Sequence, residues 1–326
     1  MMTIYDYTAR IRDLINAPRK QFLLIEDRDV WLKLCSSLDA IGDTDLALDS
    51  YLAERFPSKE GALYVIVYGV LQVLYVQQNA VGDLLRALGI KIAHEKYPRL
   101  SRIRDIRSAS IGHPTTKKTK GGHSYHFITR VTLRKSGFML LSDRPDGSTH
   151  WEEVRIPDLI AEQRHDVADI LRRVITALET EEDRHREQFR GERLQDLLPP
   201  SLSYHFQKIA EATAGKTTEV GTALGQVSVK TMREALERLR DALTRRGLAE
   251  AYHLNEYIEV ILYPLSEIDT FFEAIKTGAP PGLNERLAYI CAFFVDNRIE
   301  RLRQMAREID EEYAKRVRSE GGGSTA

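Results

Sequence analysis

The chain has 326 residues, which is enough for two domains and a sizeable core. Lysine plus arginine (47) nearly cancel aspartate plus glutamate (48), so the net charge of −1 excludes a generally basic nucleic-acid coat and leaves only a local patch for such binding. Two cysteines, Cys35 and Cys291, exclude a disulfide framework, and the N-terminal residues form no basic-then-apolar leader. We therefore expect a cytoplasmic protein.

The first 90 residues predict helices. Residues 1–60 place apolar side chains at helical spacing, with Asp27 or Asp29 as a candidate N-cap. Residues 62–88 are the most hydrophobic segment, but its uncharged first part spans only about 22 Å, less than the ~30 Å hydrocarbon core of a membrane. The sequence Gln77-Gln78-Asn79 then interrupts the apolar run. We expect the central helix of a bundle, ending at Gly89, and no membrane span.

A second helix is expected over residues 91–113, bent at Pro98. Gly112 loosens its last turn and Pro114 ends it, because proline has no backbone N–H to donate. Residues 115–122 predict a flexible basic loop. Residues 99–135 hold ten basic side chains against one acid, a local charge of +9 that predicts an anionic ligand, with a polyphosphate backbone favoured.

The spacing of apolar residues changes from helical to alternating over residues 123–156, where residues typical of turns separate the alternating stretches. This pattern predicts a small antiparallel β-meander. His123 and His126 have a spacing that metal ligands use, but no cysteine or carboxylate lies near them in the sequence. We therefore expect neither a metal nor another cofactor.

Helices return after Pro157 and continue to the C-terminal region. The break at Leu197-Leu198-Pro199-Pro200 predicts a domain boundary, which separates a helical domain with its β-meander (1–198) from an all-helical domain (199–318). Residues 319–326 are glycine-rich and are expected to form a linker or disordered tail. The predicted fold class is mainly α: a helical bundle with a small antiparallel meander and a C-terminal all-helical domain.

Arg107 and His113 are the candidate catalytic residues. Similar spacings occur at Arg144…His150 and Arg246…His253, but only Arg107…His113 lies at a predicted helix end, beside the apolar helix and inside the basic patch. On a straight α-helix six positions correspond to about 240° of rotation and ~9 Å of rise, so one chain does not bring both side chains to one phosphate. Two copies related by a two-fold axis would do so.

The sequence Arg107-Ser-Ala-Ser-Ile-Gly-His113 resembles the Arg-x(4–6)-His motif of the HEPN superfamily. The apolar stretch Leu71–Ala80 and the segment Ile103–Arg107 are also similar to HEPN proteins, and the resemblance covers residues 60–120. It implies a metal-independent endoribonuclease with a composite site in a homodimer, in a family whose members often serve as toxins or anti-phage defence effectors. Ser108 departs from the Asn, Asp or His that is frequent there. We expect RNA binding by Arg102, Arg104, Ser108, Lys117, Lys118 and Lys120.

The implied reaction is attack of an RNA 2′-hydroxyl on the adjacent phosphate. His113 would act as general acid or base, and Arg107 would stabilise the charge that develops on the phosphorane oxygens. Two alternatives remain: a HEPN-like module that binds RNA, a nucleotide or a protein without cutting, and a helical adaptor whose basic patch is incidental. The 199–318 domain could bind a protein partner or a regulator, and its sequence does not indicate which of these roles it has.

Overall fold

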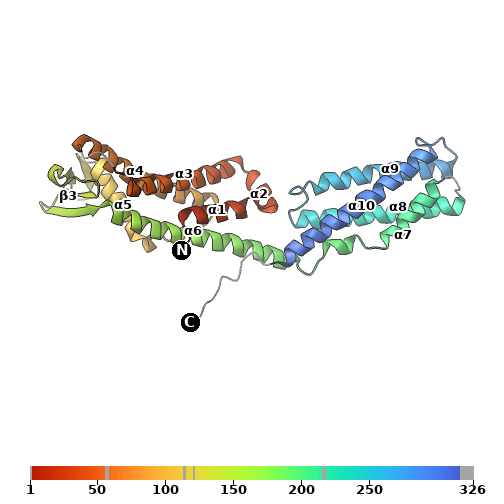
Figure 1. Cartoon of the computed structure of the whole chain (residues 1–326). Helices are drawn as coiled ribbons and strands as arrows, with labels where there is room; N and C mark the ends of the chain where they lie inside the picture. The colour runs from red at the N-terminus through yellow and green to blue at the C-terminus, as the bar shows by residue number, and fades with distance from the viewer. Residues whose placement is uncertain (1, 56–58, 113–114, 120–121, 215–217, 316–326) are drawn as a thin grey trace. The chain divides into compact units, whose positions relative to one another are not determined.

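The structure is a computed structural model that describes residues 2–55, 59–112, 115–119, 122–214 and 218–315. It is mainly helical with one small antiparallel sheet, which confirms the predicted fold class. The chain divides into two compact units (Figure 1). Unit 1 comprises residues 1–16 and 24–178, and unit 2 comprises residues 17–23 and 179–326.

Helices form the body of unit 1, and the longest of them are α3, α4 and α6. Asp27 caps α3 by accepting from the backbone N–H groups of Asp29 and Val30, as the sequence indicated. Gly89 follows the end of α4 in the left-handed conformation, at φ 66°, so the predicted stop is also confirmed. Figure 1 shows α3 and α4 side by side, with α6 along the same bundle. The helices up to residue 189 are α1 (Ile4–Ile15), α2 (Pro18–Ile25), α3 (Arg28–Ala53), α4 (Glu60–Ala87), α5 (Pro98–Arg107) and α6 (Ile156–Phe189). Most of α2 and the end of α6 belong to unit 2.

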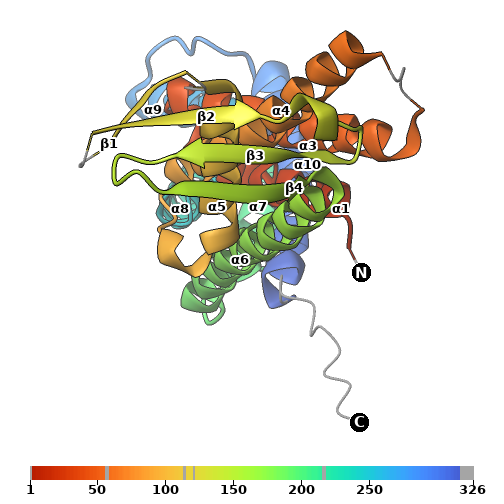
Figure 2. The ribbon, with the colours of Figure 1, turned by 90° about the vertical axis from the view of Figure 1, so that its left-hand side faces the viewer.

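The sheet covers one end of this bundle. Its strands pair in chain order and antiparallel, and Phe127, Leu141 and Trp151 stand opposite one another across β2, β3 and β4. Phe138, Leu140 and Val154 point to the other face and join the core made by α3, α4, α5 and α6. Figure 2 shows the three longer strands in front of the helices. The strands are β1 (Lys117–Thr119), β2 (Gly122–Ile128), β3 (Gly137–Asp143) and β4 (Thr149–Arg155).

Three local predictions were wrong. The helix expected over residues 91–113 does not bend at Pro98; α5 begins there, because proline suits the first helical turn, and a 3₁₀ turn (His94–Lys96) precedes it. The segment expected to be a basic loop contains β1, which pairs with β2. The alternation from Tyr125 to Arg134 predicts one strand, but β2 ends at Ile128 and residues 130–132 form a 3₁₀ turn.

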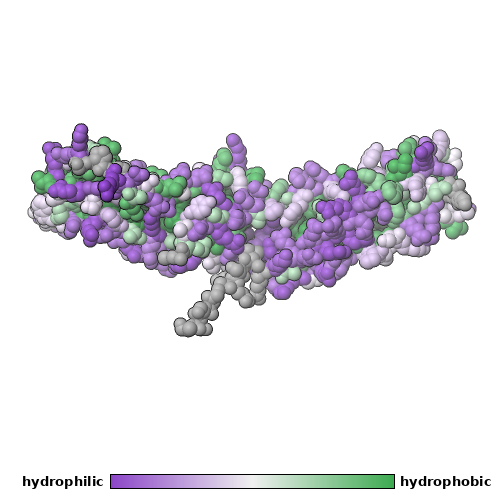
Figure 3. Space-filling model, in the orientation of Figure 1, coloured by the Kyte–Doolittle hydropathy of each residue, from purple (hydrophilic) through white to green (hydrophobic). Residues whose placement is uncertain are grey.

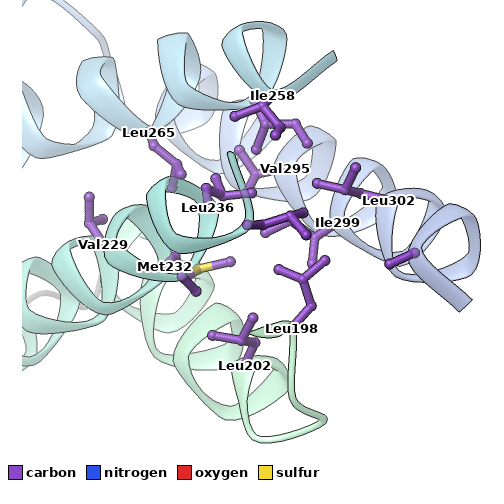
Figure 4. Packing of buried hydrophobic residues seen from close by; sticks show 14 of the residues in the cluster. Leu198, Leu202, Val229, Met232, Leu236, Ile258, Leu265, Val295, Ile299 and Leu302 are labelled. Atoms are coloured by element: carbon purple, nitrogen blue, oxygen red, sulfur yellow. The ribbon is translucent and has the colours of Figure 1, made fainter. Parts of the chain in front are cut away.

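Unit 2 is a helical bundle whose core is drawn in Figure 4. The boundary between the units falls inside α6, between Leu178 and Glu179, about twenty residues before the predicted one. Leu198 and Leu202, on either side of the double proline, are buried in the unit 2 core, so this segment is a packed corner. The expected tail at 319–326 lies outside the described residues. The remaining elements are a 3₁₀ turn (Leu194–Leu197), α7 (Leu202–Thr213), α8 (Glu219–Arg245), α9 (Leu254–Thr277) and α10 (Glu285–Ala314).

Among the described residues, α4 is the one helix whose length and apolar composition would suffice to cross a membrane. Its inward side packs into unit 1, with Val67, Leu71 and Leu74 fully buried. Val65 is 73% exposed on the outward side. The face shown in Figure 3 has hydrophobic residues interspersed with hydrophilic ones.

Asp169 on α6 fixes the start of α5 and makes unit 1 sensitive to acid. It accepts hydrogen bonds from Arg173 (2.8 Å) and Tyr97 (2.7 Å), and these bonds lower its pKa to about 2 from 3.8. Because the folded pKa is the lower one, this stabilisation is present above pH 4 and is lost as the pH falls from about 4 to about 2. Asp169→Asn should therefore shrink the fall in melting temperature between pH 5 and pH 2.5, measured by circular dichroism. The exposed Asp158→Asn is the control, and an equal shrinkage there would contradict the assignment.

Candidate functional site

The candidate site lies where α5 packs against α4. His113, Pro114 and Lys120 fall outside the described residues, so the site is built from the residues around them. Arg104 and Arg107 are three positions apart on α5 and therefore share one side of that helix. The sequence predicted Arg104 as an RNA-binding residue and Arg107 as a catalytic residue. The structure brings the two side chains together over one aromatic ring on α4.

Arg107 is held by neutral groups. Its Nη2 and Nε donate to the side-chain oxygen of Gln72 at 2.8 and 3.3 Å. Its guanidinium carbon lies 4.5 Å from the centre of the Tyr75 ring, within cation–π distance. These contacts fix the orientation of the guanidinium without neutralising its charge.

Arg104 is held in the same manner. Its Nε donates to Gln78 and its Nη2 to Asn79, both at 2.7 Å. Its guanidinium carbon lies 4.9 Å from the centre of the Tyr75 ring. A hydrogen bond with Asn79 and the positive charges of Arg104 and Arg107 lower the pKa of Tyr75 below its usual value. The tyrosine thus shares its ring between two cations.

Hydrogen-bonded glutamine side chains in the core hold Gln78, which accepts from Arg104. Gln78 donates to Gln163 of α6 at 2.7 Å, and Gln163 donates to Gln77 at 2.7 Å and to the Leu74 carbonyl at 3.0 Å. Gln77 and Gln163 are fully buried. The Nε2 of Gln77 has no hydrogen-bond partner among the described residues, whereas both ends of the Gln78 amide are hydrogen-bonded, which fixes the side chain that accepts from Arg104.

Several other basic residues of the patch are neutralised. Arg99 pairs with Asp166, and Arg130 with Glu60 at 2.8 Å. Arg102, a predicted RNA-binding residue, pairs with Glu152 (3.0 Å) and Glu162 (3.3 Å), and Lys117 pairs with Asp105 at 3.6 Å. The local charge is therefore smaller than the count of +9 indicates.

Arg104 and Arg107 differ from these residues. No carboxylate of the described residues lies within 4.0 Å of either guanidinium. Lys118 is exposed on β1, and Ser108 is half-buried at the C-cap of α5. Arg104 and Arg107 are thus the two cations of the described patch that have no carboxylate within 4.0 Å and share one aromatic ring. Two partly buried, oriented guanidinium groups are suited to bind phosphate oxygens.

The turn after Arg107 changes the expected geometry. Residues 108–112 form a π-helical turn, a rare and wider conformation that recurs at functional sites. A side-chain carbon on Gly112 would lie 3.0 Å from Nη1 of Arg107, so the guanidinium folds back against the residue just before His113. Residues 108–112 therefore do not follow the straight α-helix on which the separation of Arg107 and His113 was projected, and that separation stays a prediction because His113 lies outside the described residues.

Gly112→Ala tests this contact. The added methyl group displaces the Arg107 guanidinium by a few tenths of an ångström. In the RNA cleavage that the HEPN resemblance implies, we expect this misplacement to lower the rate about 10-fold. The melting temperature should not fall, because alanine is the better helix former. Gly42→Ala on α3, with open space around it, is the control. Equal rates for the two variants would show that Arg107 does not depend on this contact.

The residues that support the two arginines were not identified from the sequence. Gln77, Gln78 and Asn79 appeared only as an interruption of an apolar run. Polar side chains in a helix expected to be buried on most sides were the available signal, since such groups need partners.

The chain matches no protein-family model, no curated protein and no solved structure.

Proposed function

We propose that this protein is a metal-independent endoribonuclease of the HEPN type. The observation that carries the proposal is the pair Arg104 and Arg107, held by neutral amides over Tyr75 with no carboxylate counter-ion among the described residues. Oriented cations of this kind stabilise the negative charge that a phosphoryl group gains during transfer. Arg107 packs against Gly112, and the motif Arg-x(5)-His supplies a histidine as the next residue in the sequence.

The proposed reaction needs only groups of the protein and the RNA. The 2′-oxygen attacks the adjacent phosphorus, its proton leaves to a base, and the P–O5′ bond breaks as the 5′-oxygen takes a proton. His113 serves as the acid, because an imidazole exchanges protons near neutral pH. Arg107 binds the non-bridging oxygens, and Arg104 binds the phosphate of a neighbouring nucleotide. The products are a 2′,3′-cyclic phosphate and a 5′-hydroxyl.

Acid and base are separate roles, and one His113 per chain fills one of them. A homodimer that brings two motifs to one phosphate supplies both, as the resemblance implies. In the cell such an enzyme would act as a toxin or as a defence effector that halts growth by cutting RNA. Growth arrest on expression of the wild-type chain, absent for Arg107→Ala at equal protein level, would support that role.

The purified chain with a mixed-sequence RNA in excess EDTA tests the proposal. Cleavage is expected, together with a dimer in solution by light scattering. RNA binding without cleavage would overturn the enzyme and favour the binding module. If the chain neither binds nor cleaves RNA, the basic patch is incidental and the proposal is overturned. Cleavage that requires an added divalent metal would overturn the proposed mechanism.

A further inference from the structure

A cavity opens beside Arg104, at the N-terminal part of α5. It has a volume of about 220 Å³ and lies between α4, α5 and α6. Val81 and Leu85 of α4, Leu100 of α5 and Ile170 of α6 form apolar walls. Its volume is below the range of about 300–1,000 Å³ that suits drug-sized ligands, so it fits a compact apolar group.

The polar groups of this cavity connect it to the anion site. Gln78 and Arg104 both line it, and the same two side chains are joined by the 2.7 Å hydrogen bond described above. The exposed side chain of Ser101 lies one turn earlier on α5. A ligand that fills the cavity and reaches Arg104 therefore has an apolar body, an attached anionic group and room for a hydrogen bond.

A nucleotide has this combination, with a base joined through its sugar to a phosphate. Arg104 and Arg107 are separated by about 4.5 Å of helical rise, so each guanidinium can receive the phosphate of one of two neighbouring nucleotides. With the scissile phosphate at Arg107, the nucleotide whose phosphate lies at Arg104 is placed beside the cavity. Bases of single-stranded RNA are free to turn into such pockets, since they are not held by pairing.

We propose that this cavity, the base slot, binds the base of the nucleotide next to the scissile phosphate and sets the base preference of the enzyme. The inference rests on the proposed ribonuclease function for the location of that phosphate. The slot takes a base against its apolar walls and discriminates between bases through the exposed Ser101 hydroxyl.

Gly82 provides the means to close the slot. It lines the cavity from α4, and a side-chain carbon there would meet only Arg86, at 3.5 Å, which is an ordinary contact. Gly82→Leu therefore places a bulky side chain at the lining of the slot without a close contact at its Cβ, and the helix gains a better helix former. Gly61→Leu is the matched control, because Gly61 lies on the same helix in open space and away from the slot.

Two measurements with these variants decide the matter. The first maps the ends cut in an RNA that contains all base steps. The wild type and Gly61→Leu should prefer one base beside the cut, and Gly82→Leu should cut with that preference reduced to within about 2-fold. The second measures binding of a non-cleavable 2′-O-methyl oligonucleotide with and without the base at that position. Loss of the base should weaken binding by about 5- to 100-fold for the wild type and not for Gly82→Leu.

The outcomes separate the two proposals. Unchanged base preference and unchanged binding in Gly82→Leu would overturn the base slot while leaving the ribonuclease in place. Base-dependent binding that Gly82→Leu abolishes, in a protein that cuts no RNA, would support the slot and overturn the ribonuclease. Equal binding of the intact and abasic oligonucleotides by the wild type, with displacement of both by an alkyl carboxylate such as decanoate, would assign the cavity to an aliphatic ligand and overturn the inference.

Discussion

Arg107→Lys is expected to lower the rate of RNA cleavage by about 10²–10³-fold, the cost of removing one oriented donor from a site where negative charge develops. Lysine keeps the charge but loses the planar fork that donates two hydrogen bonds, from Nη2 and Nε, to the side-chain oxygen of Gln72 and packs on Tyr75. The loss should appear in single-turnover cleavage, which reports the chemical step.

The control for this variant is Arg155→Lys at the end of β4, an exposed arginine paired with Asp158 at 3.4 Å. Surface pairs of this kind contribute little, so its cleavage rate and melting temperature should equal those of the wild type. A wild-type rate for Arg107→Lys would mean that Arg107 acts only as a cation. A fall of the rate together with unfolding would assign Arg107 to stability instead.

Gly137→Ala is expected to destabilise unit 1 by about 3–5 kcal/mol, in the range of severe core substitutions. Gly137 has φ 152°, in a region that L-residues rarely adopt, and a side-chain carbon there would lie 1.9 Å from the carbonyl oxygen of Val154 on β4. Neither strand can accept the methyl group without moving, because Gly137 pairs directly with Arg155. The unfolding transition of unit 1, followed by calorimetry, should fall by at least about 6 °C.

Gly147→Ala separates backbone strain from the close approach of the two strands. Gly147 also has a positive φ, of 77°, but nothing lies within 4 Å of the position of its side-chain carbon. This variant should cost only about 1–2 kcal/mol, the penalty of the left-handed conformation. Equal effects at the two glycines would show that the contact with Val154 does not determine the requirement for glycine at 137.

The features that depend on neighbouring residues in the sequence were predicted correctly. The cap at Asp27, the stop at Gly89 and the alternation in the meander each depend on residues close together in the sequence, and all three appear in the structure. The clamp on Arg104 could not be predicted in this way. Gln78 and Arg104 are 26 positions apart, and only the packing of α5 on α4 brings them within hydrogen-bond distance.

The same limit explains the errors. The pairing of Lys117 with Asp105 and of Arg102 with Glu152 arises from tertiary contacts, so a count along the sequence overstated the free positive charge. The double proline marked a break in the helical pattern, but the buried neighbours Leu198 and Leu202 place that break inside the unit 2 core. The π-helical turn after Arg107 had no distinct signal beyond Gly112 and Pro114.

The chemistry of the cut bond tests the central claim most directly. An RNA with a single cleavage site is compared with the same RNA carrying one 2′-deoxy sugar at that site, both in EDTA. The wild type should cut the first RNA to a 2′,3′-cyclic phosphate and a 5′-hydroxyl and leave the second intact. His113→Ala, as a folded protein of unchanged oligomeric state, should cut neither. Cleavage at the deoxy position, or a 5′-phosphate end, would contradict attack by the 2′-hydroxyl at Arg107 and His113.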